Sequence, residues 1–294
     1  MYNFAFIRLS VLSASLVLLP IAGCRSDSDR SSLARIQRYN SAAGAVLEPA
    51  RQDSILASER TLPTAVRIGR WARRFLESDG VEYRFGPADG GYVAEGRIIH
   101  DRSHDCVSLM YRCTELAQAT DHLDAVLVAL RTRFFGADPD SIADSEGKVD
   151  YDRPEHLDYS LDMIRSGHWG LDVTAELSGA KPDSVGTSRY PAGSYFYVPR
   201  PGLVAGELRE GDIVWLVLDP GHPAAGELRR KYGLVIGHIG IVIVHEAKPW
   251  LVHAARSDLV GWYDGGTVVR VPLTVYLDRV ERFAGIVVTR FTKN

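Results

Sequence analysis

The stretch from His104 to Met110 constrains this chain most, because an irregular, glycine-rich segment gives way there to a helical pattern. Cys106 stands at the junction. After it, apolar residues recur at steps of three and four, the spacing of one helix face, at Leu109/Met110, Cys113 and Leu116/Ala117. A cysteine in the first turn of a helix lies at the positive end of the helix dipole, which favours the thiolate. The position therefore predicts a thiol of lowered pKa, with a buried structural cysteine as the alternative.

Residues 1–23 are predicted to be a targeting segment and not part of the fold. Arg8 precedes an uncharged apolar run from Leu9 to Ile21, which is shorter than the roughly 20 residues of a membrane-spanning helix. The small residues directly before Cys24 resemble the lipobox of bacterial lipoproteins. That resemblance implies a lipidated N-terminus at Cys24, followed by a tether over residues 24–60. An ordinary secretory signal with a chance cysteine is the alternative.

The expected location follows from the same segment. A lipid on Cys24 would anchor the protein in the cell envelope, on the periplasmic face of a bacterial membrane. Arg25, and not an aspartate, follows the cysteine, which by analogy suggests the outer membrane.

If Cys24 is lipidated, Cys106 and Cys113 are the two remaining thiols. Seven residues along one helix separate their Cα atoms by about 10 Å, too far for a disulfide. Two free thiols are unusual in an exported protein, because its compartment is oxidising. This favours a chemical role for one of them.

Residues 61–294 are expected to form the folded domain, with helical patterns first and strand patterns afterwards. Helices are predicted from about Ala65 to Leu76, from Asp121 to Phe135 and from Asp158 to Ser166. Strands are predicted at residues 211–217, 238–244, 250–254, 267–271 and 285–291, with a long polar loop at 220–230. This order predicts an α+β domain with an antiparallel sheet. The net charge of −3 gives no indication of a nucleic-acid partner.

Two histidines complete a set of residues with catalytic potential. A thiol nucleophile needs a base that takes its proton, and the base needs a polar group that fixes its tautomer. His238 begins one predicted strand and His253 lies near the end of the next, positions that can be neighbours in a hairpin. Each histidine alone is more typical of an ordinary structural residue, but together with Cys106 they favour a catalytic site.

Five short motifs occur in the same order as in a known enzyme family. The sequences Tyr83-Arg84-Phe85-Gly86, Asp105-Cys106, Gly211-Asp212-Ile213-Val214, Gly237-His238-Ile239-Gly240-Ile241 and Val252-His253-Ala254 resemble those of the NlpC-type papain-like cysteine peptidases and amidases. The resemblance implies a papain-like fold with the nucleophile at a helix start packed on an antiparallel sheet. It also implies Cys106 as nucleophile, His238 as general base and His253 as the residue that orients the base. Tyr83 matches a substrate-site tyrosine near the nucleophile.

An insertion at about 136–200 carries a narrower resemblance. Asp150-Tyr151-Asp152-Arg153 with His156, followed by Leu171-Asp172-Val173-Thr174, is similar to the N-acetylmuramoyl-L-alanine amidase-like branch. The branch implies cleavage of the amide between muramic acid and L-alanine in peptidoglycan fragments. Because the insertion can wall off one end of the groove, Arg153 and His156 are our candidates for substrate-binding residues in that wall. An acidic residue that often follows the branch's nucleophile by five positions is Tyr111 here.

Other functions remain open at this point. A D,L-endopeptidase of the peptidoglycan stem peptide, a thioester-forming acyltransferase and a non-catalytic cell-wall-binding lipoprotein are the alternatives. The mechanism needs no cofactor and no metal. His100, His104 and His122 could in principle bind zinc, but no cysteine pair at ligand spacing accompanies them. The sequence does not predict the oligomeric state.

Overall fold

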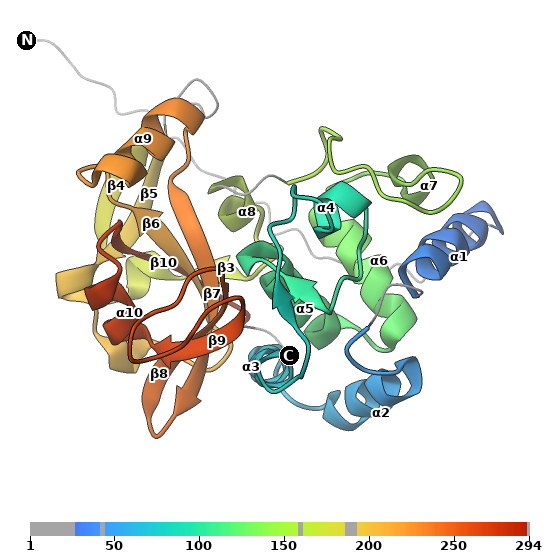
Figure 1. Ribbon diagram of the computed structural model, residues 1–294, viewed down its shortest axis with the longest axis horizontal. Helices are drawn as coiled ribbons and strands as arrows, with labels where there is room; N and C mark the ends of the chain where they lie inside the picture. The colour runs from blue at the N-terminus through green and yellow to red at the C-terminus, as the bar shows by residue number, and fades with distance from the viewer. Residues whose placement is uncertain (1–26, 42–44, 158–160, 186–192, 293–294) are drawn as a thin grey trace, which may run out of the picture.

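The computed structural model describes residues 27–41, 45–157, 161–185 and 193–292. The first half of the chain forms a helical layer, and the second half forms a sheet that lies beside it (Figure 1). Cys24 and the predicted signal segment lie outside the described residues, as do short parts of the 136–200 insertion. Within the described ranges, no helix is long and apolar enough to cross a membrane.

The helical half contains the three helices that the periodicity predicted. They are α3 (Thr64–Leu76), α6 (His122–Arg133) and α8 (Leu161–Ser166). The helix that begins with the cysteine is α5 (Cys106–Gln118). The other helices of this half are α1 (Asp27–Ser41), α2 (Pro49–Glu59), α4 (Tyr92–Glu95) and α7 (Pro139–Ile142).

The sheet has eight strands, in the order β4-β5-β10-β6-β7-β8-β9, with β3 paired to β10. All five predicted strands are present, as β6 (Ile213–Leu218), β7 (Ile236–His245), β8 (Lys248–Ala255), β9 (Thr267–Pro272) and β10 (Phe283–Arg290). Every pairing in this sheet is antiparallel, which confirms the α+β class. A separate parallel pair joins β1 (Glu82–Tyr83) to β2 (Ser103–His104).

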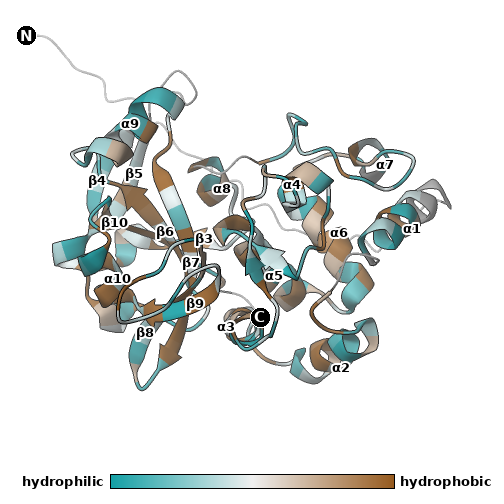
Figure 2. Cartoon of the chain, viewed as in Figure 1, coloured by the Kyte–Doolittle hydropathy of each residue, from teal (hydrophilic) through white to brown (hydrophobic). Residues whose placement is uncertain are grey.

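Both faces of the sheet are buried, which explains the continuous apolar runs. Side chains alternate between opposite faces of a strand. On β6, Trp215 packs against the helical half, whereas Leu216 packs in a second core that includes residues of α9 (Pro223–Tyr232) and α10 (Leu273–Arg279). Figure 2 shows hydrophobic residues along the central strands and on the helices that meet them.

The insertion extends the sheet, which the sequence did not predict. It supplies β3 (Leu171–Asp172) and β5 (Gly193–Pro199), both paired with β10, and β4 (Lys181–Val185), paired with β5. Short 3₁₀ turns also occur in this part of the chain, at Thr174–Glu176, Arg200–Gly202 and Ala205–Glu207. The insertion is therefore built into the domain and is not an appendage.

Two predictions about the polar segments were wrong. The segment at 220–230 is not a loop, because it contains most of α9, which begins after His222 and buries Ala225 against the sheet. The folded part also does not begin at residue 61. Leu33 and Ile36 of α1 are buried in the domain core, and the amide oxygen of Asn40 accepts hydrogen bonds from the N–H groups of Ile98 and Ile99. Polar composition concealed α9 and the packing of α1 into the domain, because each helix has only a narrow apolar stripe.

Candidate active site

Cys106 is the first residue of α5, as the sequence predicted, and its neighbours define the start of that helix. Asp105 is the N-cap, and its carboxylate accepts hydrogen bonds from the N–H groups of Val107 (3.0 Å) and Ser108 (2.8 Å). The Ser108 hydroxyl accepts in return from the Asp105 N–H at 3.0 Å, which completes a capping box. These bonds hold the cysteine in one orientation.

The glycine-rich lead-in is tied to the same cap. The Gly86 N–H donates to the second oxygen of Asp105 at 2.9 Å. A Cβ atom at Gly86 would lie 2.5 Å from the ring of Tyr92, so the close approach requires glycine. The irregular segment before the cysteine is thus fixed by Asp105, although its sequence has no helical or strand pattern.

The pKa of the Cys106 thiol differs from the expectation. Burial and, to a smaller extent, the Asp105 carboxylate raise it, whereas N–H groups of Ile239, Cys106 and Val107 lower it, and the result is a pKa of about 12. The helix start does favour the thiolate, but desolvation of the sulfur has the larger effect. Cys113 is also free and is fully buried inside α5, where burial raises its pKa as well.

The two predicted histidines meet on adjacent strands. Ile241 of β7 pairs with Val252 of β8, so His238 and His253 lie diagonally across the ladder. Nε2 of His238 lies 2.8 Å from Nδ1 of His253, and the rings meet edge to face at 4.9 Å. This contact uses Nε2 of His238 and leaves its Nδ1 free to accept a proton. A neutral His238 with its proton on Nε2 would donate to His253.

Aromatic residues surround this histidine pair. Tyr276 and Phe283 stack on the ring of His238, and Tyr263 and Tyr276 contact the ring of His253. Burial lowers the pKa of His238 well below its ordinary value, with the charges of His253 and Arg282 adding to the effect. Burial also lowers the pKa of His253 to about 3. Both imidazoles are therefore neutral at pH 7.

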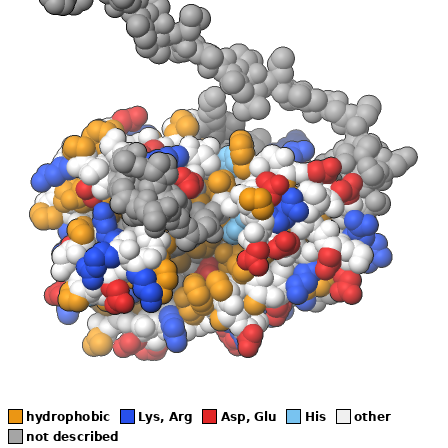
Figure 3. Space-filling view, turned by 90° about the horizontal axis from the view of Figure 1, so that it is seen from above, with side chains coloured by type: hydrophobic (Ala, Val, Ile, Leu, Met, Phe, Trp, Pro, Cys, Tyr) orange, Lys and Arg blue, Asp and Glu red, His pale blue; other side chains and the backbone are white. Residues whose placement is uncertain are grey.

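One pocket of about 1130 Å³ brings the cysteine and the histidines together. Its lining includes Cys106, His238, His253, Tyr83 and His156, five of the residues that the sequence analysis selected. The pocket lies between the helical half and the sheet. The space-filling view shows histidine side chains beside hydrophobic ones near this boundary (Figure 3).

Tyr83 lies close to the thiol. Burial raises the pKa of its hydroxyl to about 12, and negative charge on Cys106 and Asp105 contributes to the shift. His156 lines the pocket from the insertion, and its Nε2 has no hydrogen-bond partner among the described residues. Burial lowers the pKa of His156 to about 4, so its ring is neutral at pH 7.

Arg153 is placed elsewhere, contrary to the prediction that it forms the pocket wall. Its guanidinium donates to the backbone oxygen of Ser141 at 2.6 Å and pairs with Glu155 at 3.1 Å. These contacts turn the side chain toward the polar loop that contains α7. Tyr151, two residues earlier, lines the pocket instead, and the sequence analysis did not select it.

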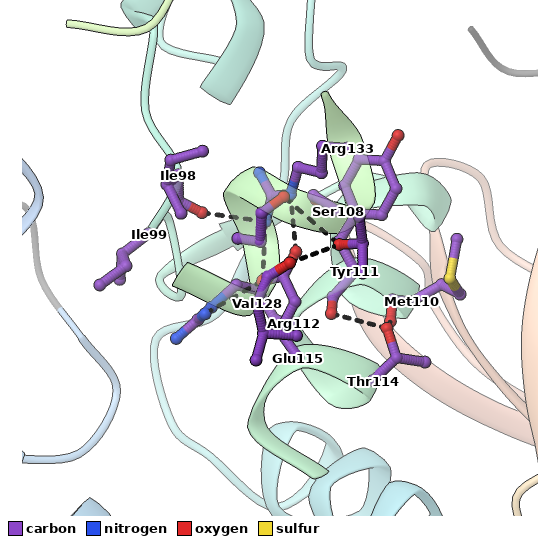
Figure 4. A network of polar contacts seen from close by, with 12 residues as sticks. Ile98, Ile99, Ser108, Met110, Tyr111, Arg112, Thr114, Glu115, Val128 and Arg133 are labelled. Atoms are coloured by element: carbon purple, nitrogen blue, oxygen red, sulfur yellow. Dashed lines mark hydrogen bonds and ion pairs between the residues drawn. The ribbon is translucent and has the colours of Figure 1, made fainter. Parts of the chain in front are cut away.

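A buried network of charges holds Tyr151 in place, and Figure 4 shows its members Arg112, Glu115 and Arg133. Arg133 of α6 donates to the Tyr151 hydroxyl at 2.7 Å, and Tyr151 donates to the backbone oxygen of Arg97. Arg133 also pairs with Glu115 of α5 at 2.7 Å, and Glu115 accepts from Arg112. The network thereby joins the cysteine helix to the pocket wall. The links from Arg133 to Glu115 and to Tyr151 each span 18 residues, so no local pattern predicts them.

The three histidines considered as zinc ligands have separate partners. Nδ1 of His100 bonds Ser103, Nδ1 of His104 lies 3.2 Å from the Ser108 hydroxyl, and His122 pairs with Asp53 at 2.8 Å. Across the described ranges, no group of three or more His, Cys, Asp or Glu side chains is arranged to hold a metal ion.

Solved structures with a similar fold exist, although no family model and no curated protein matches the sequence. Crystal structures of an N-acetylmuramoyl-L-alanine amidase from Bacteroides uniformis share 21% identity and a TM-score of 0.55; one covers 79% of this chain and 99% of the amidase chain. A Legionella pneumophila protein matched to family DUF1460 shares 16% identity and a TM-score of 0.59, over 82% of this chain and 93% of its own. At such low identity, the similarity shows that the chain has an amidase-like fold.

Proposed function

We propose that the chain is a cell-wall hydrolase that cleaves the amide between N-acetylmuramic acid and L-alanine in peptidoglycan or muropeptides. The observation that carries the proposal is the convergence, in one pocket, of a cysteine at a helix start and a hydrogen-bonded histidine pair. The amidase named in the similar crystal structures supports the choice of bond. We also propose that the fold is a papain-like fold of the NlpC type.

The reaction begins with a neutral thiol and a neutral imidazole. Because the pKa of Cys106 is raised and that of His238 is lowered, a preformed ion pair is not the resting state. The thiol proton moves to Nδ1 of His238 as the sulfur attacks the amide carbon. The bound substrate displaces water, and negative charge develops on its carbonyl oxygen during the attack. The backbone N–H groups of Cys106 and Ile239 would stabilise that charge.

The remaining steps regenerate the enzyme. As the carbon–nitrogen bond breaks, His238 returns the proton to the nitrogen of L-alanine, and an acyl thioester with Cys106 remains. Water then attacks the thioester, with His238 taking its proton and returning one to the sulfur. His253 accepts the Nε2 proton of His238 in a hydrogen bond and so keeps Nδ1 free for these transfers.

The wall formed by the insertion is the candidate binding surface for the sugar. Tyr151 and His156 present aromatic rings 5.0 Å apart, and Nε2 of His156 is unpaired among the described residues. An unpaired polar atom beside an aromatic ring is suited to a sugar that offers hydroxyl groups and an apolar ring face. We also propose that Cys24 carries a lipid that anchors the protein in the envelope.

The test uses a muramyl tetrapeptide, the same peptide without sugar, and mass spectrometry of the products. Release of intact tetrapeptide from the first, and no cleavage of the second, is the expected result. Cys106→Ala should abolish turnover, whereas Cys113→Ala, which changes the other thiol of the same helix, should retain it. Cleavage within the peptide would instead identify a D,L-endopeptidase, and binding without turnover would identify a non-catalytic wall-binding protein.

A further inference from the structure

The two walls of the pocket differ in chemistry. The helical half and the insertion contribute aromatic side chains, at Tyr92, Tyr111, Tyr151 and His156, together with the carboxylates of Asp105 and Asp152. The sheet half contributes Tyr263 and Tyr276 and all the arginines of the pocket lining, which come from the residues after β8, the end of α10 and the connection between α10 and β10. Its charged residues are Arg256, Arg279 and Arg282, with Asp258 and Glu281. Three arginines against two carboxylates leave this second wall with a net positive charge.

The arginines of this wall are available to a ligand. Within the described residues, none of the three forms an ion pair, although Asp258 and Glu281 belong to the same wall. All three are exposed. An arginine without a resident carboxylate, at the edge of a pocket, can bind an anionic group without first breaking an internal ion pair.

Arg282 is also held in place beside the candidate base. Its guanidinium lies 4.9 Å from the centre of the Phe283 ring, and its charge lowers the pKa of the Tyr276 hydroxyl, although burial raises that pKa overall. Both rings stack on His238, at 6.0 and 6.4 Å between ring centres. One aromatic ring therefore separates the Arg282 charge from the imidazole of His238.

Arg256 directs its charge at the same space. Although burial raises the pKa of Tyr83 overall, the charges of Arg256 and Arg282 both lower it, so both act on the tyrosine next to Cys106. Arg256 follows β8, two residues after Ala254 and three after His253. The two arginines thus flank the reacting groups from the sheet side.

An amide substrate must place its acyl part and its amine part on opposite sides of the attacked carbon. If the acyl part carries the sugar, the aromatic wall suits it, and the peptide extends along the arginine wall. Stem peptides carry free carboxylates, and the planar guanidinium fork matches a carboxylate in two parallel hydrogen bonds. This step rests on the function proposed above.

We propose that Arg282 and Arg256 bind a carboxylate of the peptide leaving group, so that the sheet-side wall is an anionic-peptide subsite. The enzyme should then prefer a peptide with a free carboxylate near the cut bond over the same peptide with that carboxylate amidated. Hydrogen bonds to charged groups of this kind are worth enough to change the preference by about 10- to 100-fold.

The test compares N-acetylmuramoyl-L-alanyl-D-glutamate with its D-isoglutamine form in wild type, Arg282→Gln, Arg256→Gln and Arg270→Gln. Arg270 is an exposed arginine over Trp250, outside the pocket lining, and controls for the loss of charge. We expect the ratio of kcat/KM values for acid over amide to fall at least tenfold in Arg282→Gln, mainly through KM, and to stay unchanged in Arg270→Gln. Arg282→Lys should recover part of the ratio.

A second measurement separates this inference from the proposed function. Calorimetric binding of free L-alanyl-D-glutamate to Cys106→Ala needs no catalysis, and it should weaken at least tenfold when Arg282→Gln is added. Unchanged peptide affinity in that double variant would overturn the subsite. If binding depends on the carboxylate but the amide next to the sugar is not cleaved, the anionic-peptide subsite is supported and the proposed amidase function is rejected.

Discussion

The buried charge network under the cysteine helix provides a stability prediction. Glu115 accepts hydrogen bonds from Arg133 at 2.7 and 2.9 Å and from Arg112 at 3.2 Å. Arg112 has a second carboxylate partner, Asp101 at 2.6 Å, whereas Arg133 has no other ion-pair partner in the described parts of the chain. The side chains of Glu115, Arg112 and Arg133 are at most 1% exposed.

Glu115→Gln should therefore leave Arg133 as a buried charge without a counterion. Removing one partner of a buried ion pair costs about 3–5 kcal/mol, because the other charge cannot be rehydrated. For a chain of this size, each kcal/mol lowers Tm by about 2 °C, so we expect a fall of roughly 6–10 °C. Tyr151, which Arg133 positions, should lose order at the same time, and KM should rise.

Urea denaturation followed by circular dichroism measures the change in the free energy of unfolding. Glu82→Gln is the matched control, because Glu82 pairs with Arg84 at 3.2 Å but both side chains are about half exposed or more. An exposed pair of this kind contributes less than about 1 kcal/mol. If Glu115→Gln cost no more than Glu82→Gln, the network would not stabilise the domain and the reasoning would be refuted.

Four further predictions concern the candidate site and the N-terminus. Iodoacetamide should modify Cys106 before Cys113, which is fully buried, and its rate should still rise above pH 9 because burial raises the pKa of Cys106; preferential labelling of Cys113 would contradict the assignment. His238→Ala should cost more in kcat than His253→Ala, and the double variant should cost little beyond His238→Ala, whereas additive losses would point to another base. As the pH drops from 6.5 towards 3, His253 should lower the free energy of unfolding by up to about 1.4 kcal/mol per pH unit, because the imidazole binds a proton in the unfolded chain but not in the native one. His253→Gln should make the free energy of unfolding depend less on pH in this acid range. Cys24→Ala should release the protein from membrane fractions, and unchanged detergent partitioning would argue against lipidation.

Local patterns were enough to predict five strands, the main helices and the position of the cysteine, but not α9 or the strands of the insertion. Periodic apolar residues predict α3, α5 and α6, because one face of each helix is buried. Continuous apolar runs predict the strands, because both faces of the sheet are buried. The change from a glycine-rich segment to helical spacing predicted the start of α5, and the structure adds Asp105 as its N-cap.

Two features of the site depend on the tertiary structure. The sequence placed His238 and His253 on neighbouring strands, but only strand register decides that their rings meet, because a shift by one residue would send one ring to the other face. The direction of the Cys106 pKa shift depends on burial by the whole pocket, which outweighs the helix start that the sequence reveals.

Long-range contacts decide the rest. Tyr151 lines the pocket because Arg133, 18 residues before it, holds its hydroxyl, while Arg153 turns away to Ser141. The unpaired arginines beside the base come from two separate connections of the sheet. Sequence by itself determined the strongly patterned helices and strands and the place of the thiol, since these depend on neighbours in the chain. The tertiary structure decided which side chains share the pocket, because that depends on contacts between residues far apart.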